Sequence, residues 1–181
     1  MRARLLKTVV ILLLTPAAAS AQGRMPHAGA SAVGADVGVF LPRMSGMTTG
    51  LAIDGFYEYY MTARNSLRLG VGWANPEQEA DSNAKTRQIR VGGDIVHNWE
   101  GGSVHPFVGA GLGAYSLQPR VNGVNQGTSA TKLGGTLLGG LEFFTSKTFS
   151  VKGEAAYHIV SKSGPYDPSG LALTIGVKSY F

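Results

Sequence analysis

Ionisable side chains recur at even spacing inside otherwise apolar stretches of the sequence. Asp54 and Glu58 are four residues apart, and Lys152 precedes Glu154 by two. Because successive side chains of a β-strand alternate between its two faces, even spacing gathers such groups on one face. The full set is Asp36, Asp54, Glu58, Arg68, Arg90, Asp94, Glu142, Lys152, Glu154, His158 and Lys178.

These groups predict a charge network inside a barrel. Unpaired charges are costly in a confined space, so we expect ion pairs that cross the lumen and fill it. The alternative is a gated path for small ions or protons, in which the surplus of acids holds a proton or His158 takes up charge.

A second constellation has the side-chain types of a hydrolase: His158, Ser161, Ser163 and Asp167. It resembles the site of the lipid A deacylase barrels, which use a His and a Ser at a comparable place. In that family one position separates the two residues, whereas Ile159 and Val160 separate His158 from Ser161 and turn them to opposite faces of a regular strand. We therefore predict no catalytic residue, and a lipid A deacylase-like hydrolase is the least favoured alternative.

Two further patterns predict no site. Gly109, Gly111 and Gly113 alternate along a strand and lack the strand-to-helix turn of a phosphate loop. His97 and His105 flank a short turn without a third ligand, so we expect solvated turn residues and no metal.

An acidic cluster, Glu77, Glu79 and Asp81, is followed by Lys85 and Arg87. We expect a solvated loop here. A divalent cation or a lipopolysaccharide phosphate that bridges the cluster to the two bases is the alternative. We predict no cofactor.

The elements that position these groups are strands, because the apolar stretches alternate with period two and show no helical stripe. We expect eight, close to the roughly 9 to 11 residues that a tilted strand needs to cross a bilayer. Their approximate centres are Val33–Leu41, Leu51–Met61, Leu67–Trp73, Arg87–Trp99, Phe107–Tyr115, Leu133–Phe143, Phe149–Ile159 and Leu171–Phe181.

The connections between these strands alternate in length. Four are long (Pro42–Gly50, Asn75–Ala84, Leu117–Lys132, Val160–Gly170) and three are short (Thr62–Ser66, Glu100–Ser103, Thr145–Lys147). Both termini in the periplasm would place all the long loops outside and all the short turns inside, which is typical of outer-membrane barrels. The predicted fold is all-β: an eight-stranded antiparallel transmembrane β-barrel.

The two faces of each strand indicate which one meets lipid. An eight-stranded barrel is only wide enough for side chains, so rows of large apolar residues inside would be overpacked, and we assign the charged, glycine-rich face to the lumen. Aromatic residues of the outward face gather near strand ends, as a membrane-interface girdle would. The predicted girdle and assembly residues are Tyr57, Tyr59, Trp73, Trp99, Phe143, Phe149, Tyr157 and Phe181.

The N-terminus predicts export. Arg2, Arg4 and Lys7 precede the apolar run Val9–Leu14, and a small-residue cleavage site ends at Ala21. We predict a signal peptide over residues 1–21, a periplasmic leader over 22–30 and the barrel over 31–181. Removing the signal lowers the formal charge from +5 to +2, which gives no case for nucleic acid.

Three segments carry a family resemblance: HPFVGAGLGAY (His105–Tyr115), GGLEFF (Gly139–Phe144) and LALTIGVKSYF (Leu171–Phe181). They resemble the later strands of small outer-membrane β-barrel proteins of the OmpA-transmembrane, OmpX and OmpW kind, and the resemblance covers essentially the whole mature chain. It implies location in the bacterial outer membrane and recognition by the assembly machinery, which reads a final strand ending in an aromatic residue. The chain departs from that signal at Ser179, where an apolar or aromatic residue is common.

The expected function is non-catalytic. We predict a monomer with a structural or surface-interaction role through its outer loops, chiefly Leu117–Lys132. A narrow ion or small-solute channel is the alternative. The expected partners are outer-membrane lipid and lipopolysaccharide, the assembly machinery and periplasmic chaperones.

Overall fold

The computed structural model describes residues 26–181, so the predicted signal peptide and residues 22–25 of the leader lie outside the described residues. Eight long strands form the wall: β1 (Ser31–Pro42), β3 (Gly50–Tyr60), β4 (Asn65–Ala74), β6 (Ala84–Asn98), β7 (Val104–Val121), β9 (Ala130–Phe144), β10 (Phe149–Val160) and β11 (Gly170–Tyr180). Three two-residue strands, β2 (Met47–Thr48), β5 (Glu77–Gln78) and β8 (Val124–Asn125), lie in the connections. Within residues 26–181 no helix is long and apolar enough to cross a membrane.

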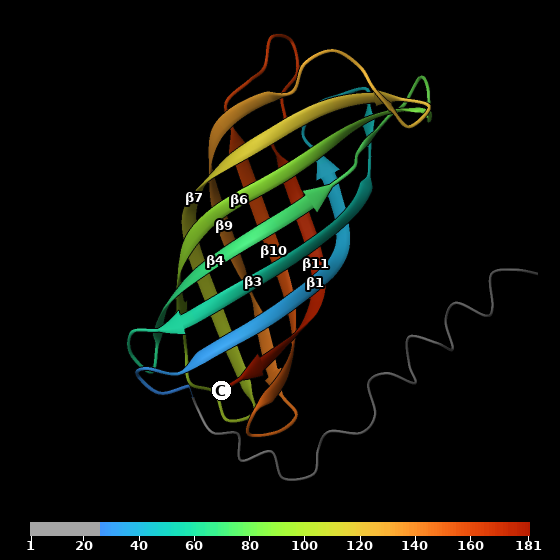
Figure 1. The fold of residues 1–181 in the computed structure, drawn as a ribbon. Helices are drawn as coiled ribbons and strands as arrows, with labels where there is room; N and C mark the ends of the chain where they lie inside the picture. The colour runs from blue at the N-terminus through green and yellow to red at the C-terminus, as the bar shows by residue number, and fades with distance from the viewer. Residues whose placement is uncertain (1–25) are drawn as a thin grey trace, which may run out of the picture.

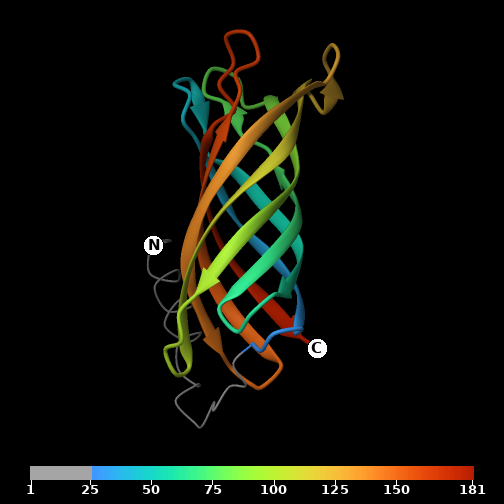
Figure 2. The same ribbon diagram turned by 90° about the vertical axis from the view of Figure 1, so that its left-hand side faces the viewer.

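The eight long strands close into a barrel. Each pairs antiparallel with the next long strand along the chain, from β1 with β3 to β10 with β11. β1 then pairs antiparallel with β11 from Ala32 opposite Tyr180 to Pro42 opposite Gly170. The strands tilt steeply around the axis (Figures 1 and 2). The predicted eight-stranded antiparallel barrel is confirmed.

Connections of two lengths lie at opposite ends of the barrel. The short turns, residues 61–64, 99–103 and 145–148, share one end with the C-terminus, and the longer connections lie at the other (Figure 2). Because outer-membrane barrels have short periplasmic turns, we refer to these as the periplasmic end and the outer end.

The outer end is more regular than the sequence predicts. β7 continues to Val121 and β9 begins at Ala130, so much of the expected loop Leu117–Lys132 is barrel wall. Asn122 and Gly123 both have positive φ, 51° and 79°, which is the backbone of a tight hairpin turn and the reason Asn-Gly is favoured there. The end of β7 and the short strand β8 therefore form a narrow hairpin that projects from the outer end.

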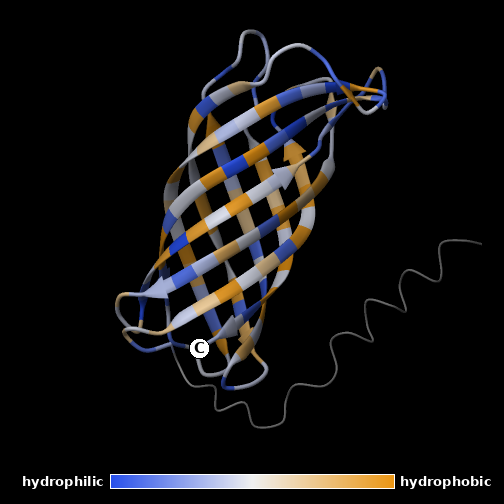
Figure 3. Ribbon diagram, viewed as in Figure 1, coloured by the Kyte–Doolittle hydropathy of each residue, from blue (hydrophilic) through white to orange (hydrophobic). Residues whose placement is uncertain are grey.

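Alternation of the strand faces explains which side chains meet lipid. Large apolar residues of the outward face are exposed along every long strand, among them Val37, Leu69, Ile95, Leu137 and Ile175. Hydropathy alternates along each strand in Figure 3. In a bilayer this outward face is in contact with acyl chains, which removes the cost of leaving it exposed.

The lumen contains more aromatic residues than we predicted. Phe40, Phe56, Tyr60, Phe107, Tyr115, Phe144 and Tyr180 all point inward and are buried. They fit because glycines face them: a Cβ at Gly34 would lie 2.2 Å from Cζ of Phe56, and one at Gly140 would lie 2.7 Å from Cζ of Phe107. The expectation of an overpacked interior is wrong, because the glycines leave space for these rings as well as for charged groups.

The chain ends beside its beginning. β11 ends at Tyr180, one residue earlier than predicted, yet Phe181 still exchanges two backbone hydrogen bonds with Ser31 of β1, at 2.9 and 3.1 Å. The Phe181 side chain is outside the barrel and 73% exposed.

Candidate functional site

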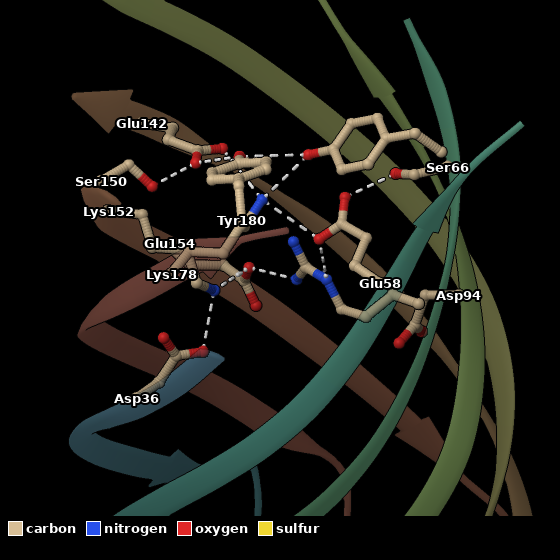
Figure 4. A network of polar contacts seen from close by, with 12 residues as sticks. Asp36, Glu58, Ser66, Asp94, Glu142, Ser150, Lys152, Glu154, Lys178 and Tyr180 are labelled. Atoms are coloured by element: carbon tan, nitrogen blue, oxygen red, sulfur yellow. Dashed lines mark hydrogen bonds and ion pairs between the residues drawn. The ribbon is translucent and has the colours of Figure 1, made fainter. Parts of the chain in front are cut away.

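A cluster of hydrogen-bonded and ion-paired side chains fills the lumen next to its periplasmic end (Figure 4). The Glu142 carboxylate accepts hydrogen bonds from the hydroxyls of Ser150 and Tyr180, and Nζ of Lys178 lies 2.9 Å from its Oε2. Nζ of Lys178 also lies 3.1 Å from Oε2 of Glu58. Lys178 thus neutralises two buried carboxylates from different strands.

The middle of the lumen continues the same chain of contacts. Nε of Arg68 lies 3.2 Å from Glu58, and its Nη1 lies 2.6 Å from Oε2 of Glu154. Nζ of Lys152 bridges Glu154, at 2.8 Å, and Asp36, at 2.7 Å. The result is one continuous path of ion pairs from Glu142 to Asp36, contributed by six of the eight wall strands: β1, β3, β4, β9, β10 and β11.

Aromatic rings support the bases of this path. The guanidinium of Arg68 lies 4.5 Å from the centre of the Phe56 ring, and Nζ of Lys152 lies 4.6 Å from it. Phe107 contacts the same two cations from 5.7 and 5.9 Å. Cation–π attraction of this kind is strongest where water is excluded, as it is here.

The predicted network is not a single network. Arg90 and Asp94, both on β6, form a separate pair in which Nη2 lies 2.6 and 2.7 Å from the two carboxylate oxygens. Among residues 26–181 no basic group comes within ion-pair distance of Asp54. It lines a small lumen cavity of about 30 Å³ together with Arg90, Asp94 and Asp36.

His158 is bonded within the lumen and not to a serine. Its Nδ1 lies 2.9 Å from the Tyr115 hydroxyl and 3.5 Å from that of Thr136. In the described part of the chain no hydrogen bond joins His158 to Ser161, Ser163 or Asp167. The hydrolase-type constellation is therefore not assembled in this structure.

The connection after β10 contacts inward side chains at the outer end of the lumen. Asp167 accepts a hydrogen bond from the Ser169 amide at 3.0 Å, and hydrogen bonding from the hydroxyl and amide of Ser169 lowers the pKa of its carboxyl group. Nε2 of Gln88 donates to the Tyr166 hydroxyl at 2.9 Å. Tyr166 packs on a buried cluster of Tyr115, Leu117 and Val160.

Several lumen residues that contact the charged groups were not predicted from the sequence. Ser66 and Ser150 donate to Glu58 and Glu142, and Tyr60 and Tyr180 lie beside Lys178. Each is two residues from a predicted network member on the same strand, so the period-two alternation also places it on the inward face. His105 is a correction of another kind: it is 3% exposed and packs on Phe144 at 4.7 Å between ring centres, where we expected a solvated turn residue.

The expected girdle residues all lie on the outer surface, but unevenly. Tyr57, Tyr59, Trp99, Phe143, Phe149 and Phe181 are exposed close to the periplasmic end. Trp73 and Tyr157 are half-buried close to the outer end. Their role as membrane anchors stays a prediction.

A closed antiparallel barrel with an apolar outer wall and a filled, charged interior defines an outer-membrane β-barrel protein. The sequence matches the family of the outer membrane protein beta-barrel domain over residues 8–181, and the chain belongs to that family. It is a protein of the bacterial outer membrane. No curated protein matches the sequence.

Solved structures share the fold. Neisserial surface protein A is 18% identical with a TM-score of 0.71, and the alignment covers 84% of this chain and 99% of that one. The attachment invasion locus protein Ail of Yersinia pestis is 15% identical with a TM-score of 0.59, covering 85% and 99%. The outer membrane enzyme PagL is 19% identical with a TM-score of 0.50, covering 82% and 98%. At these identities the likeness shows the fold alone.

Proposed function

We propose that this protein is a non-catalytic, non-conducting barrel that anchors a set of outer loops at the cell surface and presents them for contact. The observation that carries the proposal is the filled lumen. Near the periplasmic end Tyr60, Phe144 and Tyr180 are buried in one cluster, and directly above them Glu142 and Lys178 are 1% exposed. Rings and ion pairs at successive heights leave no obvious route for a hydrated ion.

The remaining space in the lumen supports the same conclusion. Two cavities, each of about 30 Å³, lie in its middle and outer parts. A site needs roughly 10 to 15 Å³ of such volume to hold one water molecule, so each has room for only about two or three. A conduction path would require several buried ion pairs to separate at once, and each separation is costly.

Features of the outer end support a surface role. The β7–β8 hairpin projects beyond the wall, and its turn residues Asn122 and Gly123 are exposed. Similar folds occur in Neisserial surface protein A and in a protein described as the attachment invasion locus protein of Yersinia pestis. Because the rigid barrel fixes the ends of each loop, loop sequence can vary without loss of the fold.

Bilayer recording tests the non-conducting part of the proposal. We expect the refolded mature chain to show no steady unitary current in a planar lipid bilayer, whereas a general porin in the same bilayer conducts. The informative variant is Arg90→Gln with Asp94→Asn, which removes the pair beside the lumen cavity without leaving a lone charge. Unitary currents in the wild type that this double variant changes would show that the lumen conducts.

Surface labelling tests the orientation. The chain has no cysteine, so one introduced thiol reports its own position. Thr128→Cys, in the exposed outer connection, should react with a membrane-impermeant maleimide on intact cells. Lys147→Cys, in the exposed turn before β10, should react only after the outer membrane is permeabilised. The reverse pattern would mean that the loops we assign to the surface face the periplasm.

A further inference from the structure

The outer wall carries a group of basic residues, Lys85, Arg87 and Arg120, which we call the β6–β7 basic patch. Lys85 and Arg87 lie on the outward face of β6, and Arg120 is opposite Lys85 on β7. Directly opposite residues of an antiparallel pair point to the same side, and diagonal neighbours lie within reach of long side chains. All three cations therefore emerge together on the outside of the barrel, near its outer end.

The two arginines of the patch lack acidic partners. Lys85 pairs with Glu77, but no carboxylate within residues 26–181 comes within ion-pair distance of Arg87 or Arg120. Nη2 of Arg120 donates to the backbone oxygen of Gly123, and Nε of both arginines is shielded from solvent without a hydrogen-bond partner. Because no carboxylate balances either guanidinium, their remaining N–H donors are suited to an external anion such as a phosphate, which accepts several hydrogen bonds.

The outer wall between this patch and the middle of the barrel is apolar. Ile89 follows Arg87 by two residues on β6 and is opposite Trp73 of β4. Val91 follows by two more and is opposite Val71. A shallow outward groove of about 520 Å³, lined by residues that include Leu69, Val71 and Val91, lies on the same face of β3, β4 and β6. Gly55 forms part of the lining, and its lack of a side chain leaves the groove open.

We propose that the β6–β7 basic patch and the apolar wall beside it form a binding site for lipid A, with a lipid A phosphate at Arg87 and Arg120 and an acyl chain along the groove. Charge and position together select this occupant, because the patch lies at the outer end of the barrel and the apolar wall begins directly beside it. Cations above an apolar surface match an anionic headgroup above acyl chains. The exposed acids Glu79 and Asp81 of the neighbouring loop repel an anionic headgroup and so weaken its binding. A divalent cation that bridges these acids to the same headgroup would remove this repulsion.

The test is lipid A binding by the refolded mature chain in phosphatidylcholine nanodiscs, titrated with purified lipid A in place of whole lipopolysaccharide. Each basic residue near a charged lipid surface changes affinity by roughly fivefold, so Arg87→Gln with Arg120→Gln should weaken binding about 30-fold. The matched control is Arg43→Gln with Lys162→Gln, which removes the same charge from two connections of the outer end near Asp167. We expect it to bind as the wild type does. Circular dichroism shows whether each variant retains the β-barrel.

Two lipid arms separate this site from general attraction of anions. Lipid A without its phosphates should bind the wild type as weakly as intact lipid A binds the double variant. Phosphatidylglycerol, which has one phosphate and two chains, should bind more weakly than lipid A and be insensitive to the double variant. The proposal is overturned if the control variant loses as much affinity as the Arg87/Arg120 variant, or if phosphatidylglycerol competes on equal terms.

Discussion

Replacing Lys178 by methionine should lower the free energy of unfolding by about 4 kcal/mol, because it leaves two buried carboxylates without their shared cation. Nζ of Lys178 lies 2.9 Å from Glu142 and 3.1 Å from Glu58, and all three side chains are almost fully buried. After the change Glu142 retains only the hydroxyl donors of Ser150 and Tyr180. The measurement is equilibrium unfolding in urea of the barrel refolded into phospholipid vesicles.

A second substitution distinguishes lost charge balance from lost packing. Lys178→Met combined with Glu142→Gln removes one charge of each sign, and Glu58 remains paired with Arg68 at 3.2 Å. The double variant should recover more than half of the lost stability, since neutral replacements of a buried pair are well tolerated. The surface control is Arg64→Gln, whose pair with Glu100 is exposed and should be worth under about 1 kcal/mol. A Lys178→Met effect no larger than this control would contradict a stabilising role for the lumen path.

Arginine at position 175 should destabilise the barrel by about 2 to 4 kcal/mol, the cost of a cation at the bilayer midplane. Ile175 is at the centre of β11, points outward and is 68% exposed. On a soluble protein such an exposed position would accept arginine with little effect, so the substitution tests directly whether the outward face contacts lipid. Unfolding in urea from the same vesicles provides the value.

The matched control for this prediction is Leu41→Arg. Leu41 also points outward, but it is next to the outer end of β1, and there the expected cost falls to about 0 to 1 kcal/mol. Equal losses at the two positions would mean that the apolar belt does not follow the membrane depth inferred from the strand ends.

The faces of the strands could be predicted from sequence because side-chain alternation is a local property. Asp54, Arg68 and Lys152 are inward and Val37, Tyr57 and Ile175 are outward, as period two requires. The eight strands and the alternation of loop lengths follow from the same local signals. The projecting hairpin is not among the predicted elements, although its signal is also local: Asn122-Gly123 between two valines is typical of a hairpin turn.

The position of each side chain along the barrel axis could not be predicted, and this position decides which charged groups form ion pairs. It depends on the register of each strand against the next, which the sequence of a single strand does not specify. For this reason Glu58 and Lys178 come together across the lumen, while Arg90 pairs with Asp94 on its own strand and Asp54 pairs with neither. The burial of His105 against Phe144 has the same origin.

The seam between β1 and β11 sets the order in which the barrel can form. Seven of the eight wall pairings join strands that follow one another along the chain, so each can zip up as a hairpin soon after its residues are available. The eighth joins Ala32 to Tyr180 and must wait for the entire polypeptide. Non-local closure of this kind is slow, because the entropy of a long loop is lost before the contact is gained. The pairing of β1 with β11 should therefore be the last to form. Lys178 of β11 meets Glu58 of β3 only when this seam closes, whereas Glu142 of β9 belongs to the same run of consecutive hairpins as Lys178.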